Sequence, residues 1–352
     1  MTKVKSTKKS SNISKALSNR IEKALLFLTN PRVRDIVERR FGIKNGKPET
    51  LEAIGQGYGI TRERIRQIEE NGLKVLKSEK ISSLLGPIFD YLNEFFVEHG
   101  NLAGEEYLYC TLTNTFEPHP LRGQLYLVLT LGEPYQRVLN DERFHPYWTT
   151  NSSSRDTAEK IVDFLVSYFN KHNRVFPEQE VLNILSQKHS DLPSGMLWVV
   201  LDISKEINKN IFGQLGLTYW PEVSPQGVKD RAYLILKREG KPLHFTTITD
   251  LINKSFADRQ AYIQTVHNEL IKDPRFVLTG RGTYALVDWG YEPGTVGEVI
   301  EKILREKKRP MTKEEILEEV LAQRQVKPTT ILLNLQRSPK TQRLEDGRYK
   351  LV

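Results

Sequence analysis

The chain of 352 residues has little of what marks several protein classes. It has a single cysteine, Cys110, which excludes an internal disulfide and a cage of thiolates around a metal. No apolar run approaches the length of a membrane span, and the lysine-rich start lacks the apolar stretch of a signal peptide. The hydrophobic fraction of 38% is ordinary. These properties predict a folded cytoplasmic protein of two or more domains, with no membrane contact.

Catalytic and metal-binding patterns are also scarce. The seven histidines are scattered and form no His-Glu-x-x-His motif, so no metal, cofactor or small-molecule ligand is predicted. Asp230 with Glu239-Gly240-Lys241 imitates the acidic set of a metal-dependent nuclease. This segment is better interpreted as a helix that ends at Gly240 and a following proline. The sequence predicts a protein that is not an enzyme, with a nuclease as a remote alternative.

The net charge of +8 is unevenly distributed. Residues 1–20 hold six basic residues and no acid, and residues 21–83 hold thirteen basic and nine acidic residues. Residues 84–226 carry a net −8, whereas residues 227–352 carry +6. A polyanion would therefore meet the N-terminal quarter first. Residues 1–19 are predicted to be a basic disordered arm, for which phosphate contact is favoured over a merely solvated tail.

The stretch "TLEAIGQGYGITRERIRQIEENGLKVLK" predicts a helix-turn-helix. Thr50 can cap a short helix, Gly59 can supply a turn, and Thr61 can cap a longer basic helix. On that second helix, one side is apolar and expected to be buried: Ile65, Ile68, Gly72 and Val75 or Leu76.

The opposite face of the same helix suits the edges of DNA bases. Arg62 and Arg66 can pair with guanine, Glu63 can accept from cytosine, and Gln67 can pair with adenine. Arg64 points sideways, where a phosphate contact is more natural. The alternative is a solvated helix with ion pairs along its surface.

The segment "RDIVERRFGI…TLEAIGQGYGITRERIRQIEENGLKVLK", within about residues 20–80, resembles region 4 of bacterial sigma-70-family factors. That module reads the −35 promoter element and docks on the flap of RNA polymerase. The resemblance implies that Arg62, Glu63, Arg66 and Gln67 read bases and that Arg40, Thr50, Leu51 and Arg64 lie near phosphates. Gly57 and Gly72 depart from the family pattern, and each is expected to cost about 1 kcal/mol of helix stability. Only a short basic tail precedes the module, so no domain that melts the −10 element is expected.

Residues after the module repeat one layout of helices followed by an apolar-alternating hairpin. The predicted fold class is mainly α with small β-wings, namely a region-4-like helix-turn-helix over 20–83 followed by tandem winged-helix units. The expected unit boundaries are 84–152, 153–223, 227–290 and 294–352. The acidic first two units are interpreted as protein-binding or spacing units.

The third unit, "AYLILKREGKPLHFTTITDLI…DPRFVLTGRGTYALVDWG", resembles a HARE-type helix-turn-helix domain, a module also found in the delta subunit of some bacterial RNA polymerases. Arg281, at the tip of its hairpin, is either a phosphate contact or an ordinary exposed turn residue.

Together these features predict a nucleoid-associated, sigma-like transcription factor that binds double-stranded promoter DNA and the flap region of the RNA polymerase core. An alternative is an RNA polymerase accessory or anti-sigma-like adaptor that binds only protein.

Overall fold

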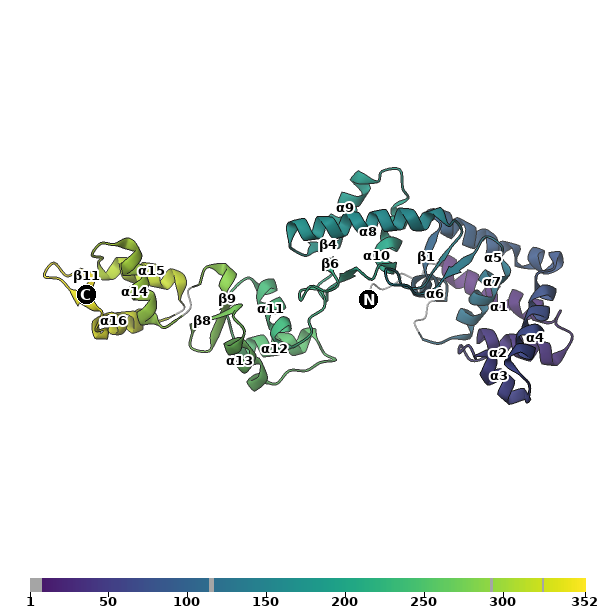
Figure 1. The fold of residues 1–352 in the computed structure, drawn as a ribbon, viewed down its shortest axis with the longest axis horizontal. Helices are drawn as coiled ribbons and strands as arrows, with labels where there is room; N and C mark the ends of the chain where they lie inside the picture. Colours follow the sequence, from purple (N-terminus) through teal and green to yellow (C-terminus); the bar gives the residue numbers. More distant parts are fainter. Residues whose placement is uncertain (1–7, 114–116, 292–293, 325) are drawn as a thin grey trace. The chain divides into compact units, whose positions relative to one another are not determined.

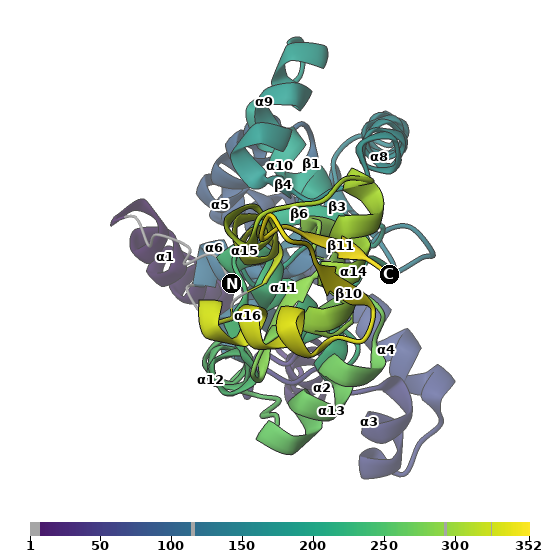
Figure 2. The same cartoon turned by 90° about the vertical axis from the view of Figure 1, so that its left-hand side faces the viewer.

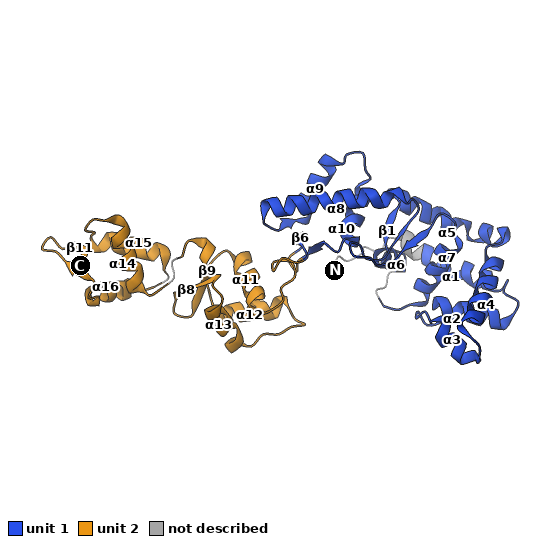
Figure 3. Ribbon diagram, in the orientation of Figure 1, with its two compact units in different colours: residues 1–209, 213–218 blue, residues 210–212, 219–352 orange. Residues whose placement is uncertain are grey.

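The structure is a computed structural model that describes residues 8–113, 117–291, 294–324 and 326–352. Within these residues, sixteen α-helices and eleven short strands form a mainly helical protein, and the strands make four small antiparallel sheets (Figure 1). The predicted helical class is confirmed. The chain divides into two compact units, one of residues 1–209 and 213–218 and one of residues 210–212 and 219–352 (Figure 3). None of the described helices is both long and apolar enough to cross a membrane.

Four helices begin the first unit, and local capping signals set the start of three of them. The side chains of Asn30, Thr50 and Thr61 each accept a hydrogen bond from a backbone N–H two or three residues later. The caps at Thr50 and Thr61 are those that the sequence predicts. The four helices are α1 (Lys8–Leu25), α2 (Pro31–Phe41), α3 (Leu51–Tyr58) and α4 (Arg62–Leu76).

The first repeat follows directly and has three helices and a three-stranded sheet. The order of strands across the sheet is β1-β3-β2, so the first strand of the repeat pairs with the last. The predicted boundary at residue 83 lies inside its first helix. The elements are α5 (Glu79–Glu98), β1 (Leu102–Gly104), α6 (Glu105–Thr113), α7 (Pro120–Leu131), β2 (Gln136–Val138) and β3 (Tyr147–Thr149).

Helix α1 corrects the prediction of a disordered arm over residues 1–19. Residues 8–19 are helical, while residues 1–7 of that arm lie outside the described residues. Leu17 and Ile21 are buried in a hydrophobic core that α1 shares with α5, α6 and α7. The helix is ordered because its apolar stripe is buried against the first repeat. One core therefore extends from α1 to Trp148 of β3.

The second repeat has the same order of elements. Its sheet order, β4-β6-β5, again places the last strand between the other two. The elements are α8 (Ser153–His172), β4 (Phe176–Pro177), α9 (Glu178–Lys188), α10 (Ser194–Ile203), β5 (Ile207–Lys209) and β6 (Gln214–Leu217).

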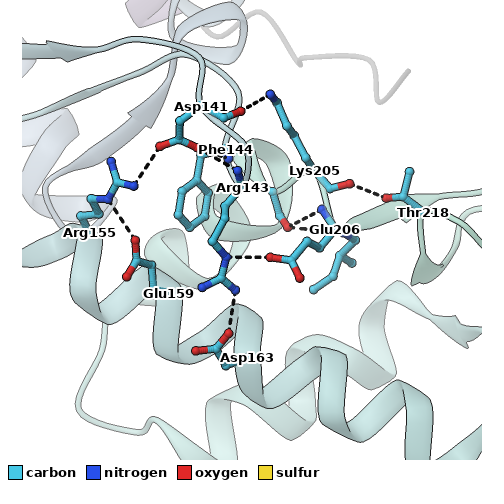
Figure 4. A network of polar contacts seen from close by, with 11 residues as sticks. Asp141, Arg143, Phe144, Arg155, Glu159, Asp163, Lys205, Glu206 and Thr218 are labelled. Atoms are coloured by element: carbon cyan, nitrogen blue, oxygen red, sulfur yellow. Dashed lines mark hydrogen bonds and ion pairs between the residues drawn. The ribbon is translucent and has the colours of Figure 1, made fainter.

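The first two repeats are joined through the segment between β2 and β3 (Figure 4). Phe144 of this segment is fully buried and forms an antiparallel bridge with Ser204, which follows α10. The Arg143 guanidinium donates to the carboxylates of Glu206 at 2.7 Å and Asp163 at 2.6 Å. Backbone pairing, apolar burial and ion pairs thus tie the two repeats together.

The second unit contains two further repeats of the same layout. In the third repeat the sheet order is β7-β9-β8. In the fourth, the first strand is reduced to a bridge between Met311 and Tyr349, which lies on the last strand. The hairpin of the fourth repeat packs against that repeat's first helix (Figures 1 and 2). The third repeat has α11 (Val228–Glu239), β7 (Leu243–His244), α12 (Phe245–Ser255), α13 (Ile263–Lys272), β8 (Phe276–Gly280) and β9 (Thr283–Leu286). The fourth has α14 (Val296–Lys307), α15 (Lys313–Gln323), α16 (Pro328–Arg337), β10 (Thr341–Arg343) and β11 (Tyr349–Leu351).

Candidate nucleic-acid interface

Helices α3 and α4 meet at a turn that requires glycine at two positions. A Cβ atom on Gly55 would lie 2.8 Å from the carbonyl oxygen of Ile60, closer than real Cβ atoms approach. Gly59 has φ 63°, in the left-handed region that glycine adopts without a steric penalty. Thr61 then caps α4. These local features fix where α4 begins and which of its faces is exposed.

A small apolar core holds the helix-turn-helix together. Ile36, Ile54 and Ile65, one each from α2, α3 and α4, are fully buried against one another. The partly buried residues around them are Leu51, Tyr58, Ile60 and Ile68. With so few buried side chains, this core depends on close contact between its helices.

Gly72 supplies such close contact. A Cβ atom at this position would lie 3.0 Å from Cγ1 of Val33 and 3.1 Å from Cγ2 of Val37, both on α2. The sequence alone predicts only a loss of helix stability from this glycine. The structure adds that its missing side chain lets α2 and α4 pack closely. Gly57 differs, because its Cβ would make an ordinary 3.5 Å contact with the flexible Arg39 side chain.

The four residues predicted to read bases lie together on the exposed face of α4. Arg62, Glu63, Arg66 and Gln67 occupy its first two turns and are all exposed, while Ile65 on the opposite face is fully buried. Arg64 is exposed at the side of this face. On the predicted buried side, Ile65, Gly72 and Leu76 are buried and Ile68 is partly buried, whereas Val75 is 46% exposed.

Polar contacts link the residues that are predicted to read bases to one another and to their neighbours on α4. The Arg66 guanidinium donates to both carboxylate oxygens of Glu63, at 2.9 and 2.7 Å, and also pairs with Glu70. The hydrogen bond from Arg66 lowers the pKa of Glu63, and the same bond raises the pKa of Arg66. Arg64 donates to Oε1 of Gln67 at 3.0 Å. Because these groups are solvent-exposed, such pairs are weak and can exchange for contacts with DNA.

Arg40, predicted to lie near a phosphate, also connects two helices in this structure. Its Nη1 donates to the backbone carbonyl of Glu49 at 3.2 Å, and its Nε lies 3.4 Å from the carboxylate of Glu69 on α4. Burial raises the pKa of Glu69, and the charge of Arg40 opposes that shift. Arg40 therefore helps to fix α4 relative to α2.

Apart from Arg64 on α4, the other predicted phosphate contacts lie at two separate places. Thr50 and Leu51 begin α3, where the Thr50 hydroxyl accepts from the N–H of Ala53 and the Leu51 side chain is half-buried. Contact there would involve backbone N–H groups at the helix N-terminus. Arg281 is exposed at the turn between β8 and β9, in the second unit.

Sequence reasoning missed a polar cluster beneath α3. Arg39 makes two hydrogen bonds to the Glu49 carboxylate, at 3.0 and 2.7 Å. Asp35 accepts from the Tyr58 hydroxyl at 2.7 Å and from Lys44 at 2.9 Å. Burial tends to raise the pKa of Asp35, but the bonds from Lys44 and Tyr58 leave that pKa below its usual value. No local pattern signals these pairs, because the partners come together only when the helices pack.

The nuclease-like pattern lies on a single helix. Asp230 and Glu239 both belong to α11, which ends at Gly240 in a left-handed conformation, as the preferred interpretation predicts. Asp230 is nearly buried and accepts from Arg275 at 2.9 Å. The two acids therefore do not lie on adjoining strands.

Comparisons with known proteins match the N-terminal quarter. A family model described as sigma-70, region 4, matches residues 30–78. Over 73 residues, or 21% of this chain, the sequence is 41% identical to the RNA polymerase sigma factors SigA of Microcystis aeruginosa and of a Synechocystis species. It is 40% identical to SigA1 of Synechococcus elongatus over the same length.

The chain spans less than a fifth of the length of these curated relatives, between 17% and 18%. The matched region includes α2, α3 and α4 with all predicted contacts except Arg281. The HARE-type resemblance at residues 227–290 stays a prediction. Residues 30–78 are a sigma-70 region 4 domain, and the similarity assigns no family to the rest of the chain.

Proposed function

We propose that this protein is a sigma-like transcription factor that recognises a −35-like element in double-stranded promoter DNA through α4. The observation that carries the proposal is the exposed set Arg62, Glu63, Arg66 and Gln67 within the region 4 domain. These residues occupy the opening turns of the second helix of a helix-turn-helix, which is the part that enters the major groove.

Base reading exchanges the ion pairs of the free helix for contacts with DNA. Arg66 can release Glu63 and donate both guanidinium hydrogen bonds to O6 and N7 of a guanine. The freed Glu63 carboxylate can then accept from a cytosine N4, and Gln67 can leave Arg64 to pair with an adenine. Arg64 is left to contact a phosphate, and phosphate contacts fix the register of the helix in the groove.

The partner that we propose is the RNA polymerase core, at its flap region. The support is the similarity to proteins named RNA polymerase sigma factors, together with the region 4 match. The role is positional, in which the protein recognises a sequence and binds polymerase there. Such a role belongs to the nucleoid in the cytoplasm and needs no cofactor.

We further propose that the four repeats are winged-helix units. Their support is the shared order of helix, short strand, two helices and hairpin, with the last strand in the middle of each three-stranded sheet. The bridge of Met311 with Tyr349 gives the fourth repeat the same arrangement in reduced form. The first two repeats, with a net charge of −8 over residues 84–226, suit protein contact or spacing.

The test is selection of preferred duplexes from a randomised pool by the full chain, followed by binding to selected and scrambled duplexes. Arg66→Ala and Gln67→Ala are each expected to weaken the free energy of binding to the selected duplex by about 1–3 kcal/mol. Neither change is expected to weaken binding to the scrambled duplex. Lys74→Ala is the matched control, because Lys74 is exposed on the last turn of α4, beyond the reading residues.

Equal selectivity of parent and variants would overturn the assignment of base reading. No binding to any duplex, with polymerase still recovered from nuclease-treated cells, would instead favour the adaptor that binds only protein.

A further inference from the structure

A groove runs along one face of α5, between the end of α4 and the segment that follows α7. Its apolar lining comes from all three elements and includes Leu76, Phe89 and Leu131. The α5 residues that line it are spaced three or four positions apart, as one face of a helix requires. The groove has a volume of about 330 Å³, which is within the range of sites that take ligands. It is therefore large enough to receive side chains of another molecule.

The groove is open to solvent along α5. Ser82 and Asn93 line its two ends on this helix, and both are exposed. They are eleven residues apart, which corresponds to about 16 Å along a helix. This shape suits a segment that lies on the surface better than a small molecule that has to be enclosed.

The wall that follows α7 is held in place by Tyr135. The Tyr135 hydroxyl donates to Oδ1 of Asn93 at 2.7 Å, and the Phe89 carbonyl oxygen is 3.3 Å away. The rings of Tyr135 and Phe89 are stacked, with their centroids 6.2 Å apart. A Cβ atom on Gly132 would lie 2.6 Å from the Tyr135 ring, so only glycine leaves the ring in this position. The wall is thus formed before any ligand binds, which lowers the entropic cost of binding.

The two charged residues that line the groove have opposite signs and lie on different elements. Lys77 directly follows α4, and Glu133 lies two residues after the end of α7. Both are exposed. Neither forms an ion pair with another residue that the structure describes, in contrast to Glu105 and Arg137 of the same repeat. Both charges are therefore available to a ligand.

The charge around the groove changes sign along its length. Residues 81–121 hold six acidic residues and no lysine or arginine. Burial raises the pKa of Tyr135, and the negative charge of nearby Asp90 adds to that shift. The part of the groove beside Tyr135 is therefore negative, whereas the part beside α4 has the positive charge of Lys77.

We infer that this groove binds a peptide segment of a partner protein in which two large apolar side chains lie between an acidic and a basic residue. A cavity of about 150 Å³ holds one benzene-sized group, so a groove of about 330 Å³ has room for two. The acidic residue of the segment pairs with Lys77 and the basic residue with Glu133, which fixes its direction in the groove. The inference goes beyond the proposed function, because it requires neither base reading nor polymerase.

The test selects peptides from a random display library on the full chain, without DNA, and then measures their affinities. Ser82→Phe is expected to weaken binding of the selected peptides on the order of tenfold or more, because the new ring takes the place of an apolar side chain of the peptide. Ser83→Phe is the matched control, since Ser83 is exposed on the same helix but does not line the groove. It is expected to keep the parental affinity.

A second pair of variants tests the two charges. Lys77→Glu and Glu133→Lys are each expected to weaken binding by about 2–5-fold, as for exposed ion pairs. The double variant is expected to prefer a peptide in which the acidic and basic residues are exchanged, because the groove then has the opposite polarity. Both changes are at exposed positions, and thermal unfolding checks that each variant is folded.

Selection of no peptide would overturn the inference, as would equal effects of Ser82→Phe and Ser83→Phe. Peptides selected only for positive charge, with affinity unchanged by Ser82→Phe, would show general attraction to the acidic repeat and would also overturn it. The outcome is separable from that of base reading. Ser82→Phe is expected to keep the parental preference for a selected over a scrambled duplex, whereas Arg66→Ala is expected to lose that preference and keep the affinity for the peptides.

Discussion

Glycines at neighbouring positions of α3 have different roles, although they look alike in the sequence. Gly55 lies where the chain leaving the turn passes so close that no side chain fits. Gly57 faces a flexible arginine and leaves room for a methyl group. The helix-turn-helix therefore depends on Gly55 for its geometry, and Gly57 only lowers the stability of α3.

Gly55→Ala is expected to destabilise the α3–α4 turn by about 1–3 kcal/mol, because its Cβ would contact the Ile60 carbonyl and a buried site cannot easily relax. Gly57→Ala is expected to stabilise α3 by up to about 1 kcal/mol. Amide hydrogen exchange of α3 and α4 measures both changes locally. Equal effects at the two positions would contradict this distinction.

Sequence reasoning succeeds at residues whose roles are set by their neighbours in the chain. Thr50, Gly59 and Thr61 could be predicted because a cap or a left-handed turn involves only a few consecutive residues. Arg40 could not be placed in this way. Its contacts with Glu49 and Glu69 exist only because α2 packs against α4.

At the scale of an element, α1 shows that a buried apolar stripe can order a segment that is rich in lysine. Its lysine-rich sequence predicts a solvated arm when charge alone is considered. The periodic burial of Leu17, Ile21 and Leu25 against the first repeat outweighs that tendency. The helix begins at Lys8, and its order depends on helices that follow much later in the chain.

Ile21→Ala is expected to destabilise the first unit by about 2–5 kcal/mol, since Ile21 is fully buried and its removal leaves a cavity. Leu26→Ala is the matched control, because Leu26 follows the same helix and is 64% exposed. We expect the control to change stability by less than about 0.5 kcal/mol. Thermal unfolding of the full chain measures the overall stability of both variants. Hydrogen exchange of the α5 and α7 amides is the local probe. An α1 that is not part of the core would give similar results for both variants.

At the scale of the whole molecule, the repeats follow one plan but are joined in different ways. Their layout was predictable because helix periods, alternating hairpins and linker composition recur along the chain. The joints were not predictable, because they consist of contacts between segments far apart in sequence. Phe144 and Arg143 give no signal in the sequence that they reach into the second repeat.

Phe144→Ala is expected to lower the free energy of unfolding by about 3–5 kcal/mol, because the ring is fully buried. The loss is expected to weaken the contact between the first two repeats. Leu139→Ala, in the same segment between β2 and β3 but 66% exposed, is the control. If amides in both repeats exchange faster in Phe144→Ala but not in Leu139→Ala, the result supports a contact that stabilises both repeats. A change confined to the first repeat would show that the two repeats are stabilised independently.

The single core that extends from α1 to β3 has a practical consequence for chimeras. A region 4 domain cut at the limits of its family match, residues 30–78, would lack α1, would carry α2 with its apolar face exposed, and would be prone to aggregate. The transplantable cassette is therefore residues 8–218, because that stretch carries the helices that cover this face and also the second repeat, against which Phe144 is buried. The region 4 domain and the first two repeats thus form one exchangeable part.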